Sequence, residues 1–183
     1  MKLSKLAKRI LAEKANDTYD YGCAMLYFNF PEINKVHDVI NPKHLYEEDQ
    51  DRTYGIENEP HTTLLYGLHK EVTPKAIKNV LDGFTFGECS IGNASLFQNE
   101  KYDVLKFDVQ GPNLHEVNKL LTKYPHTTSY PDYHPHLTIA YLKPGMGQKY
   151  VDMLKGQECQ LVPTHAIYSK PDGDKIKIGI KVK

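Results

Sequence analysis

Two short segments of the sequence carry histidine and threonine at the same spacing. Residues 60–66 read PHTTLLY and residues 135–141 read PHLTIAY, so proline, histidine, threonine and tyrosine recur at matching positions. Near neutral pH an imidazole can take up or release a proton, and a threonine hydroxyl can donate a hydrogen bond to an anionic oxygen. The pair of segments therefore predicts acid–base chemistry on an anionic group, and the repeat itself predicts a duplicated half-domain.

Both segments are rich in aliphatic residues and are predicted to be strands. Side chains two residues apart share one face of a strand, so His61 points with Thr63, and His136 points with Thr138. Two such strands lying side by side about a pseudo-two-fold axis would line one groove with two imidazoles and two hydroxyls. The same alternation predicts that the repeated tyrosines, Tyr66 and Tyr141, pack beneath the sheet on the opposite face.

Such a groove suits a phosphodiester. A neutral histidine would take the proton of the attacking oxygen, and a protonated histidine would give one to the leaving oxygen. The threonine hydroxyls would bind the non-bridging oxygens as charge builds on them. His61, Thr63, His136 and Thr138 are thus the predicted catalytic residues, and this chemistry requires no metal and no cofactor.

These histidines have other interpretations. A single histidine on a strand is more often structural than catalytic, and the matched frames of the two segments favour catalysis. A third His-x-Thr, at His126 and Thr128, lacks the aliphatic frame and is predicted to lie in a loop outside the site. A metal site is disfavoured because no Asp or Glu occurs at ligand spacing on the strand face of His61 or His136.

The elements that must position these residues alternate between strands and helices. Strands are predicted at residues 21–30, 60–68, 85–97, 102–109 and 134–142, followed by a hairpin of 160–168 and 176–182. Helices are predicted at residues 33–40, 73–81 and 145–154, and another begins after residue 113. Residues 44–55, with Glu47 and Glu48, are expected to be an exposed loop or lid. Lys106 and Asp108 alternate with apolar residues, so their strand should have one wet face. These elements predict an α+β fold.

Composition sets further bounds. The chain has 183 residues, with 23 basic and 23 acidic side chains. This zero net charge argues against a protein that coats duplex DNA. No run of 18 apolar residues occurs, so no membrane partner is expected. Three widely spaced cysteines predict reduced thiols in the cytosol. Residues 1–18 are predicted to form a helical docking segment, and residues 19–183 a single bilobal domain.

Substrate contacts are harder to assign from sequence. Tyr21 begins the first strand and offers a ring on which a base would stack, or it is a residue of the core edge. Lys143 follows the second segment, and Lys170 lies in the hairpin turn. Either lysine would bring a cation near the phosphate, although a turn lysine is more often a hairpin cap.

The two segments resemble those of the 2H phosphoesterase superfamily, which is named for two motifs of the form His-x-Thr/Ser-aliphatic. The resemblance implies a bilobal α+β fold, in which two antiparallel sheets surround a central cleft with flanking helices. It also implies that His61 and His136 are the catalytic pair and that Thr63 and Thr138 bind phosphate. Within the superfamily the chain looks most like phage enzymes that degrade the cyclic oligonucleotides of bacterial CBASS immunity, on the residues from Tyr19 to Cys23 and from Glu57 to Thr63.

The resemblance implies a cyclic di- or trinucleotide as the substrate and the host cytosol as the location. One histidine would deprotonate a ribose 2′-hydroxyl, which attacks the adjacent phosphorus. Two alternatives remain open. One is an enzyme acting on RNA ends, as a 2′,3′-cyclic phosphodiesterase or in the manner of a 2′–5′ RNA ligase. The other is a module that sequesters a nucleotide without cutting it. The sequence does not decide the oligomeric state.

Overall fold

The computed structural model describes residues 19–49, 51 and 53–183. The helix predicted for residues 1–18 lies outside this range. The described elements follow in this order: β1 (Gly22–Asn29), α2 (Ile33–Asp38), a 3-10 helix (Pro42–His44), β2 (His61–Leu68), α3 (Pro74–Leu81), β3 (Thr85–Phe86), β4 (Cys89–Gln98), β5 (Asp103–Gln110), α4 (Leu114–Leu121), β6 (His136–Leu142), α5 (Gln148–Met153), β7 (Gln160–Ser169), β8 (Lys175–Ile178) and β9 (Lys181–Val182).

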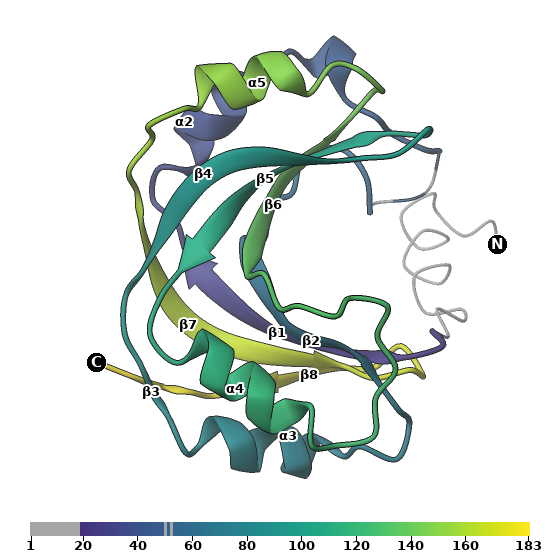
Figure 1. Ribbon diagram of the computed structural model, residues 1–183, viewed down its shortest axis with the longest axis vertical. Coiled ribbons are helices and arrows are strands. Elements are labelled where there is room, and N and C mark those ends of the chain that lie inside the picture. The colour runs from purple at the N-terminus through teal and green to yellow at the C-terminus, as the bar shows by residue number, and fades with distance from the viewer. Residues whose placement is uncertain (1–18, 50, 52) are drawn as a thin grey trace, which may run out of the picture.

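The main sheet consists of two antiparallel groups of strands. β1 lies between β2 and β7 in one group, with β8 beside β7. β5 lies between β4 and β6 in the other group. The groups join through β2 and β6 on one side and through β4 and β7 on the other, which gives a strongly curved seven-stranded sheet. The ribbon is correspondingly C-shaped, with one open side (Figure 1). The predicted α+β class, with two antiparallel sheets and flanking helices, is confirmed.

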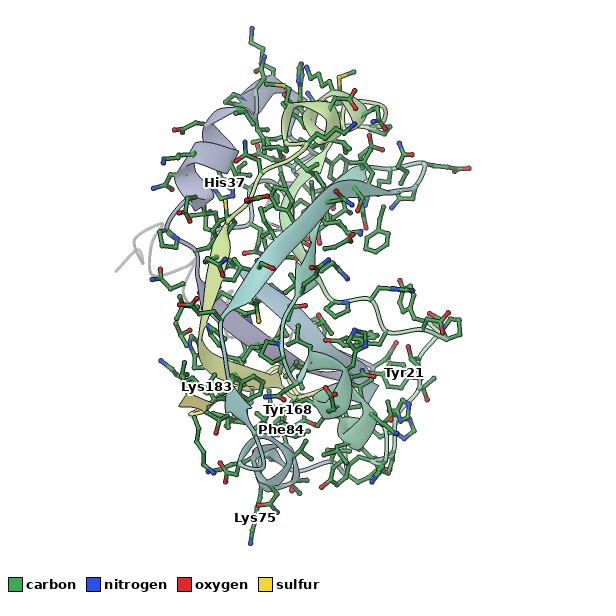
Figure 2. All side chains as sticks on the ribbon, turned by 60° about the vertical axis from the view of Figure 1, so that its left-hand side comes forward. Tyr21, His37, Lys75, Phe84, Tyr168 and Lys183 are labelled. Carbon is green, nitrogen blue, oxygen red and sulfur yellow. The ribbon has the colours of Figure 1, made fainter. Side chains whose placement is uncertain are left out.

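The helices gather at the two ends of the C (Figure 1). α3 and α4 pack together at one end, and α4 also contacts β2. At the other end α5 contacts β4, and the hydroxyl of Tyr150 on α5 accepts a hydrogen bond from the backbone of Asn41, just after α2. The core fills the space between the helices and the sheet. Tyr168, fully buried there, donates from its hydroxyl to the carbonyl of Val72 at 2.9 Å (Tyr168 is labelled in Figure 2).

Local sequence explains where several helices begin. Thr73 caps α3 by accepting a hydrogen bond from the backbone N–H of Ala76, and Pro74 occupies the first turn, as predicted. α4 begins after Asn113, whose φ of 72° is a left-handed conformation that asparagine tolerates. Both helices bury apolar residues in the core: Ile77 and Leu81 on α3, and Leu114, Val117 and Leu121 on α4.

Most predicted boundaries differ from the structure by one or two residues, and three elements differ by more. The strand predicted for residues 85–97 is divided at Gly87 and Glu88 into β3, which pairs with β9, and β4, which pairs with β5 and β7. The strand predicted for residues 176–182 is also divided, and its second part, β9, pairs in parallel with β3 rather than with β7. The helix predicted for residues 145–154 begins only at Gln148. Among the described residues, no helix has the length and apolar character needed to cross a membrane.

Candidate active site

The two repeated segments meet at the junction between the two groups of strands. β2 and β6 run antiparallel there, and Thr62 faces Leu137. Both of these side chains are fully buried on the core side. Their neighbours in sequence, the histidines and threonines of the two motifs, are partly exposed on the other side. That side of the sheet is called the histidine face below.

The antiparallel register determines which side chains are neighbours. Thr62 and Leu137 are the pair that the two strands form. Extending this antiparallel register by one step in each direction places His61 opposite Thr138 and Thr63 opposite His136. Residues directly opposite have Cβ atoms about 5 Å apart, and diagonal neighbours are about 7–8 Å apart. Each imidazole therefore has the threonine of the other segment beside it. The two imidazoles lie on a diagonal, within reach of a single phosphate group.

Both imidazoles are held in the same way. Nδ1 of His61 lies 2.7 Å from the carbonyl oxygen of Glu59, and Nδ1 of His136 lies 2.9 Å from that of His134. A carbonyl oxygen only accepts hydrogen bonds, so each Nδ1 carries the proton. Nε2 of each ring is then the nitrogen left to exchange a proton with a substrate.

The surroundings of His136 disfavour its protonated form. Burial is the main reason that its pKa lies below the ordinary value for histidine, and the charges of Lys106 and His61 lower this pKa further. The carbonyl of His134 and the carboxylate of Asp108 act in the opposite direction without cancelling the effect. The ring of Phe97 also stands edge-on against the His136 ring, with centroids 5.1 Å apart. His136 is therefore predisposed to be neutral.

Lys106, which the sequence analysis placed on a solvent-facing strand face and not in the site, lies in the row of Thr138. Lys106 on β5 is the register partner of Thr138 on β6 and of Ser95 on β4. Its side chain is only 9% exposed, and Nζ donates to Ser95 Oγ at 2.8 Å and to Asp108 Oδ1 at 3.4 Å. Nζ also lies 4.5 Å from the ring centroid of Phe97. A cation so placed adds a positive charge beside the motifs that suits an anionic ligand.

The prediction that this strand has a solvent-exposed face was wrong at Lys106, which is buried. Alternation along one strand shows which residues share a face, but it does not show what the neighbouring strands place over them. Here Ser95 and Phe97, from β4, cover the lysine.

His61 is one of three stacked rings, and the other two belong to Tyr27 on β1 and His165 on β7. Tyr27 on β1 pairs with His61 on β2 and with His165 on β7. Its ring stacks on that of His61 at 4.9 Å and on that of His165 at 5.1 Å, at interplanar angles of 22° and 17°. Burial, followed by the nearby Glu59 and Glu57, raises the pKa of Tyr27 to about 12. The tyrosine therefore acts as a neutral spacer that fixes the plane of His61.

The expectation that Tyr66 and Tyr141 pack beneath the sheet was wrong. The β1–β2 register shifts so that Leu64 is an extra residue, and the β5–β6 register shifts so that Ile139 is one. Each shift is a β-bulge, and a bulge moves the following side chains to the other face. Two consecutive core residues follow each motif threonine, and Tyr66, beyond them, is 49% exposed. Both tyrosines consequently lie on the histidine face.

Tyr141 belongs to an aromatic cluster that also fixes the acidic loop. Its ring contacts those of Tyr54 and Tyr102, and Tyr46 contacts the same two rings. Glu48 accepts from the hydroxyl of Tyr46 and pairs with Lys101. The segment expected to be an exposed loop or lid is therefore attached to the turn between β4 and β5, and its residues Glu47 and Asp49 are exposed.

The three predicted substrate contacts lie apart from the motif pair. Tyr21 stacks on His69, with centroids 5.8 Å apart, and touches Tyr66 edge-on, at the edge of the molecule (Figure 2). Lys143 donates to the carbonyl of Lys43 at 2.7 Å, just past the far end of β6. Lys170 pairs with Asp172 and Asp174 in the hairpin turn, at 2.6 and 3.4 Å, so its charge is already compensated there.

His126 lies outside the motif pair, as predicted. It bridges Leu68, at the opposite end of β2 from His61. The cysteines are free thiols, with Cys89 and Cys159 buried and Cys23 Sγ 4.0 Å from Thr63 Oγ1. In the part of the chain that the structure describes, no three His, Cys, Asp or Glu side chains are arranged to hold a metal ion.

No protein-family model matches the chain, and no curated protein matches its sequence. Solved structures do resemble it. A structure described as a phosphoesterase aligns at 16% identity over 87% of this chain and 95% of its own, with a TM-score of 0.45. E. coli LigT complexed with 3′-AMP aligns at 16% identity over 88% of this chain and 96% of its own, with a TM-score of 0.46, and LigT complexed with phosphate aligns with a TM-score of 0.41. At this level of similarity, function has to be argued from the side chains of the site.

Proposed function

We propose that this chain is a phosphodiesterase of the 2H phosphoesterase superfamily that cleaves nucleotide phosphodiester bonds without a metal. The observation that carries the proposal is the diagonal pair of imidazoles, each with Nδ1 bound to a carbonyl and Nε2 left for a substrate. A structural histidine would not require a second copy across the strand junction, with a hydroxyl beside each ring.

In the proposed reaction His136 is the base and His61 is the acid. Nε2 of the base takes the proton of a ribose 2′-hydroxyl, whose oxygen forms a bond to the adjacent phosphorus. The bond from phosphorus to the 5′ oxygen breaks, and this oxygen takes a proton from His61. The products are a 2′,3′-cyclic phosphate and a free 5′-hydroxyl. In a second step the histidines exchange roles: His61, now neutral, takes a proton from a water molecule, whose oxygen bonds to phosphorus. The bond from phosphorus to the 2′ oxygen breaks, and this oxygen takes a proton from His136.

The assignment of roles follows from unequal surroundings. Lowering of the His136 pKa by burial and by Lys106 keeps this ring neutral, as a base must be. Thr63 and Thr138 donate hydrogen bonds to the non-bridging oxygens, where charge increases in the transition state. Lys106 adds a fixed positive charge next to Thr138. Each properly placed proton-transfer group contributes about 10²–10⁴-fold to the rate.

The proposed substrates are cyclic di- or trinucleotides with 3′–5′ bonds, and the proposed role is phage counter-defence against CBASS immunity in the host cytosol. The overall charge balance is compatible with a small anionic ligand, since a protein that binds long nucleic acid usually carries a basic surplus. Cleavage of RNA 2′,3′-cyclic phosphate ends is the second candidate, because the same four side chains suit that bond.

Incubation with substrates in EDTA tests the proposal. Purified protein is mixed with cyclic di- and trinucleotides, and separately with RNA that ends in a 2′,3′-cyclic phosphate, and the products are separated by chromatography. We expect ring opening that EDTA does not reduce, and no reaction when the attacking 2′-hydroxyl is replaced by hydrogen. Opening of the RNA ends alone would favour the second candidate. Ligand recovered intact on the protein would mean sequestration, and loss of activity in EDTA would mean a metal enzyme.

The chain supplies its own control for the histidines. His61→Ala and His136→Ala should each reduce kcat by at least about 10²-fold. His126→Ala should retain activity, although His126 has the same His-x-Thr spacing and the same Nδ1 contact to a carbonyl two residues before it, at 2.9 Å. Equal activity of all three variants would refute the proposed site.

A further inference from the structure

Two exposed aromatic rings lie on the histidine face, on opposite sides of the motif pair. Phe97 is 47% exposed and Tyr66 is 49% exposed. The other large apolar side chains with comparable exposure among the described residues lie in loops, in α5 or at the C-terminal end: Tyr19, Tyr130, Met146, Met153 and Val182. Single exposed apolar residues are ordinary, but these two rings share the face that carries the motif histidines.

The strand register places Phe97 beyond one side of the motifs. Phe97 on β4 is the partner of Val104 on β5, which is in turn the partner of Tyr141 on β6. The row of Ser95, Lys106 and Thr138 lies two rows earlier, with the row of Leu96, Leu105 and Ala140 between them. From there the Phe97 ring leans back toward the motifs, reaching His136 edge-on at 5.1 Å.

Tyr66 lies on the opposite side of the motif pair from Phe97, toward the C-terminal end of β2. The bulge at Leu64 brings Tyr66 opposite Cys23, on the same face as Thr63. Tyr66 follows Thr63 by three residues, about 10 Å of strand at most. Edge-on contact with Tyr21 holds its ring while leaving half of the side chain exposed. In a nucleotide the base is displaced from the phosphate by a comparable distance, since the sugar lies between them.

We propose that Phe97 and Tyr66 are stacking platforms for two nucleobases, one on each side of the scissile phosphate. This inference rests on the proposed function and defines its substrate more closely. The bond cleaved joins two nucleosides, as in a cyclic dinucleotide or a linear dinucleotide. A terminal 2′,3′-cyclic phosphate has a nucleoside on one side only, and it would use one of the two rings.

The charge on Lys106 adds to the Phe97 platform. Its ammonium lies 4.5 Å from one side of the Phe97 ring. A cation against an aromatic ring is attracted to the negative ring face. The same cation is available to the phosphate between the two bases, so base stacking and phosphate binding are coupled at Phe97. Tyr66 has no cation against its ring in any contact that the structure describes.

A binding measurement tests the platforms without requiring turnover. The probe is a linear 2′-deoxy dinucleoside monophosphate with 2-aminopurine at either the 5′ or the 3′ position, since this base loses fluorescence when it stacks. With the wild-type chain we expect quenching at both positions. Phe97→Leu should abolish quenching at one position and Tyr66→Leu at the other, each weakening affinity about 5- to 100-fold. Leucine keeps apolar volume while removing the π-face.

Controls separate this inference from the proposed function. Met153→Leu, at an exposed site on α5, should bind as the wild type does, and Phe97→Tyr should restore quenching. Quenching at only one position, or quenching that neither leucine variant alters, would overturn the two-platform inference even if the chain cleaves cyclic dinucleotides. Failure to cleave any phosphodiester, with quenching present as expected, would overturn the proposed function and leave a two-base binding site.

Discussion

Thr62 on β2 faces Leu137 on β6, and this pair fixes the position of every proposed catalytic group. Both side chains are completely buried in the core. The core therefore holds the register of the two motifs from behind. Because a slip of one residue would turn all the motif side chains to the other face, the site depends on this contact.

Lys106→Met should shift the pH dependence of the reaction. The Lys106 charge lowers the pKa of His136, so its removal lets His136 keep a proton to higher pH. If His136 must be neutral to act as the base, the acidic limb of the kcat/KM profile moves to higher pH. Lys177→Met is the matched control, because Lys177 acts on His165 instead. An unmoved acidic limb would contradict the assignment of His136 as the base.

Thr63→Val and Thr138→Val should each reduce kcat, by about 10²-fold if the hydroxyls donate to the transition state. Valine preserves the shape of the side chain and removes only the donor. Single-turnover rates on a cyclic dinucleotide measure the effect. Thr128→Val serves as the control, since the Thr128 hydroxyl accepts from the backbone of Tyr130 at 3.1 Å, in a loop. Equal loss in Thr128→Val would point to folding rather than to catalysis.

Tyr27→Leu should reduce kcat about 2- to 13-fold, because a ring pair is worth about 0.5–1.5 kcal/mol. The variant removes the surface against which the His61 ring lies. KM should change less than kcat, since Tyr27 acts by orienting His61. His165→Ala removes only the outer ring of the stack and should have the smaller effect. A larger loss in His165→Ala would show that the third ring itself contacts the substrate.

Gly67→Ala should destabilise the fold by more than the 1–3 kcal/mol or so of an unfavourable φ. Gly67 has φ of 100°, and a Cβ there would lie 1.8 Å from the carbonyl oxygen of Thr127. Gly145→Ala is the matched control, because its φ of 78° is also positive but a Cβ there meets nothing within 4 Å. Urea unfolding followed by circular dichroism measures both. Equal losses would mean that the Thr127 loop adapts to the added methyl group.

The motifs and most elements were predictable because they depend on local patterns. The α+β class, the Thr73 cap and the sharing of a face within each His-x-Thr pair follow from short stretches of sequence. Lys106 and Tyr27 were missed because their importance comes from neighbouring strands that are distant in sequence. The face on which Tyr66 lies was predicted wrongly because an alternating pattern of residues does not show where a strand has an extra residue, as it does at Leu64.

The two motifs are alike, but what surrounds them is not. A buried lysine lies on the β5 side of the motifs, and a stack of three aromatic rings lies on the β1 side. Two matching motifs on paired antiparallel strands are thus combined with different flanking side chains. A dinucleotide also has a direction, from 5′ to 3′, so its two possible orientations on these strands are not equivalent. The unequal flanks would select one strand polarity for the bound substrate.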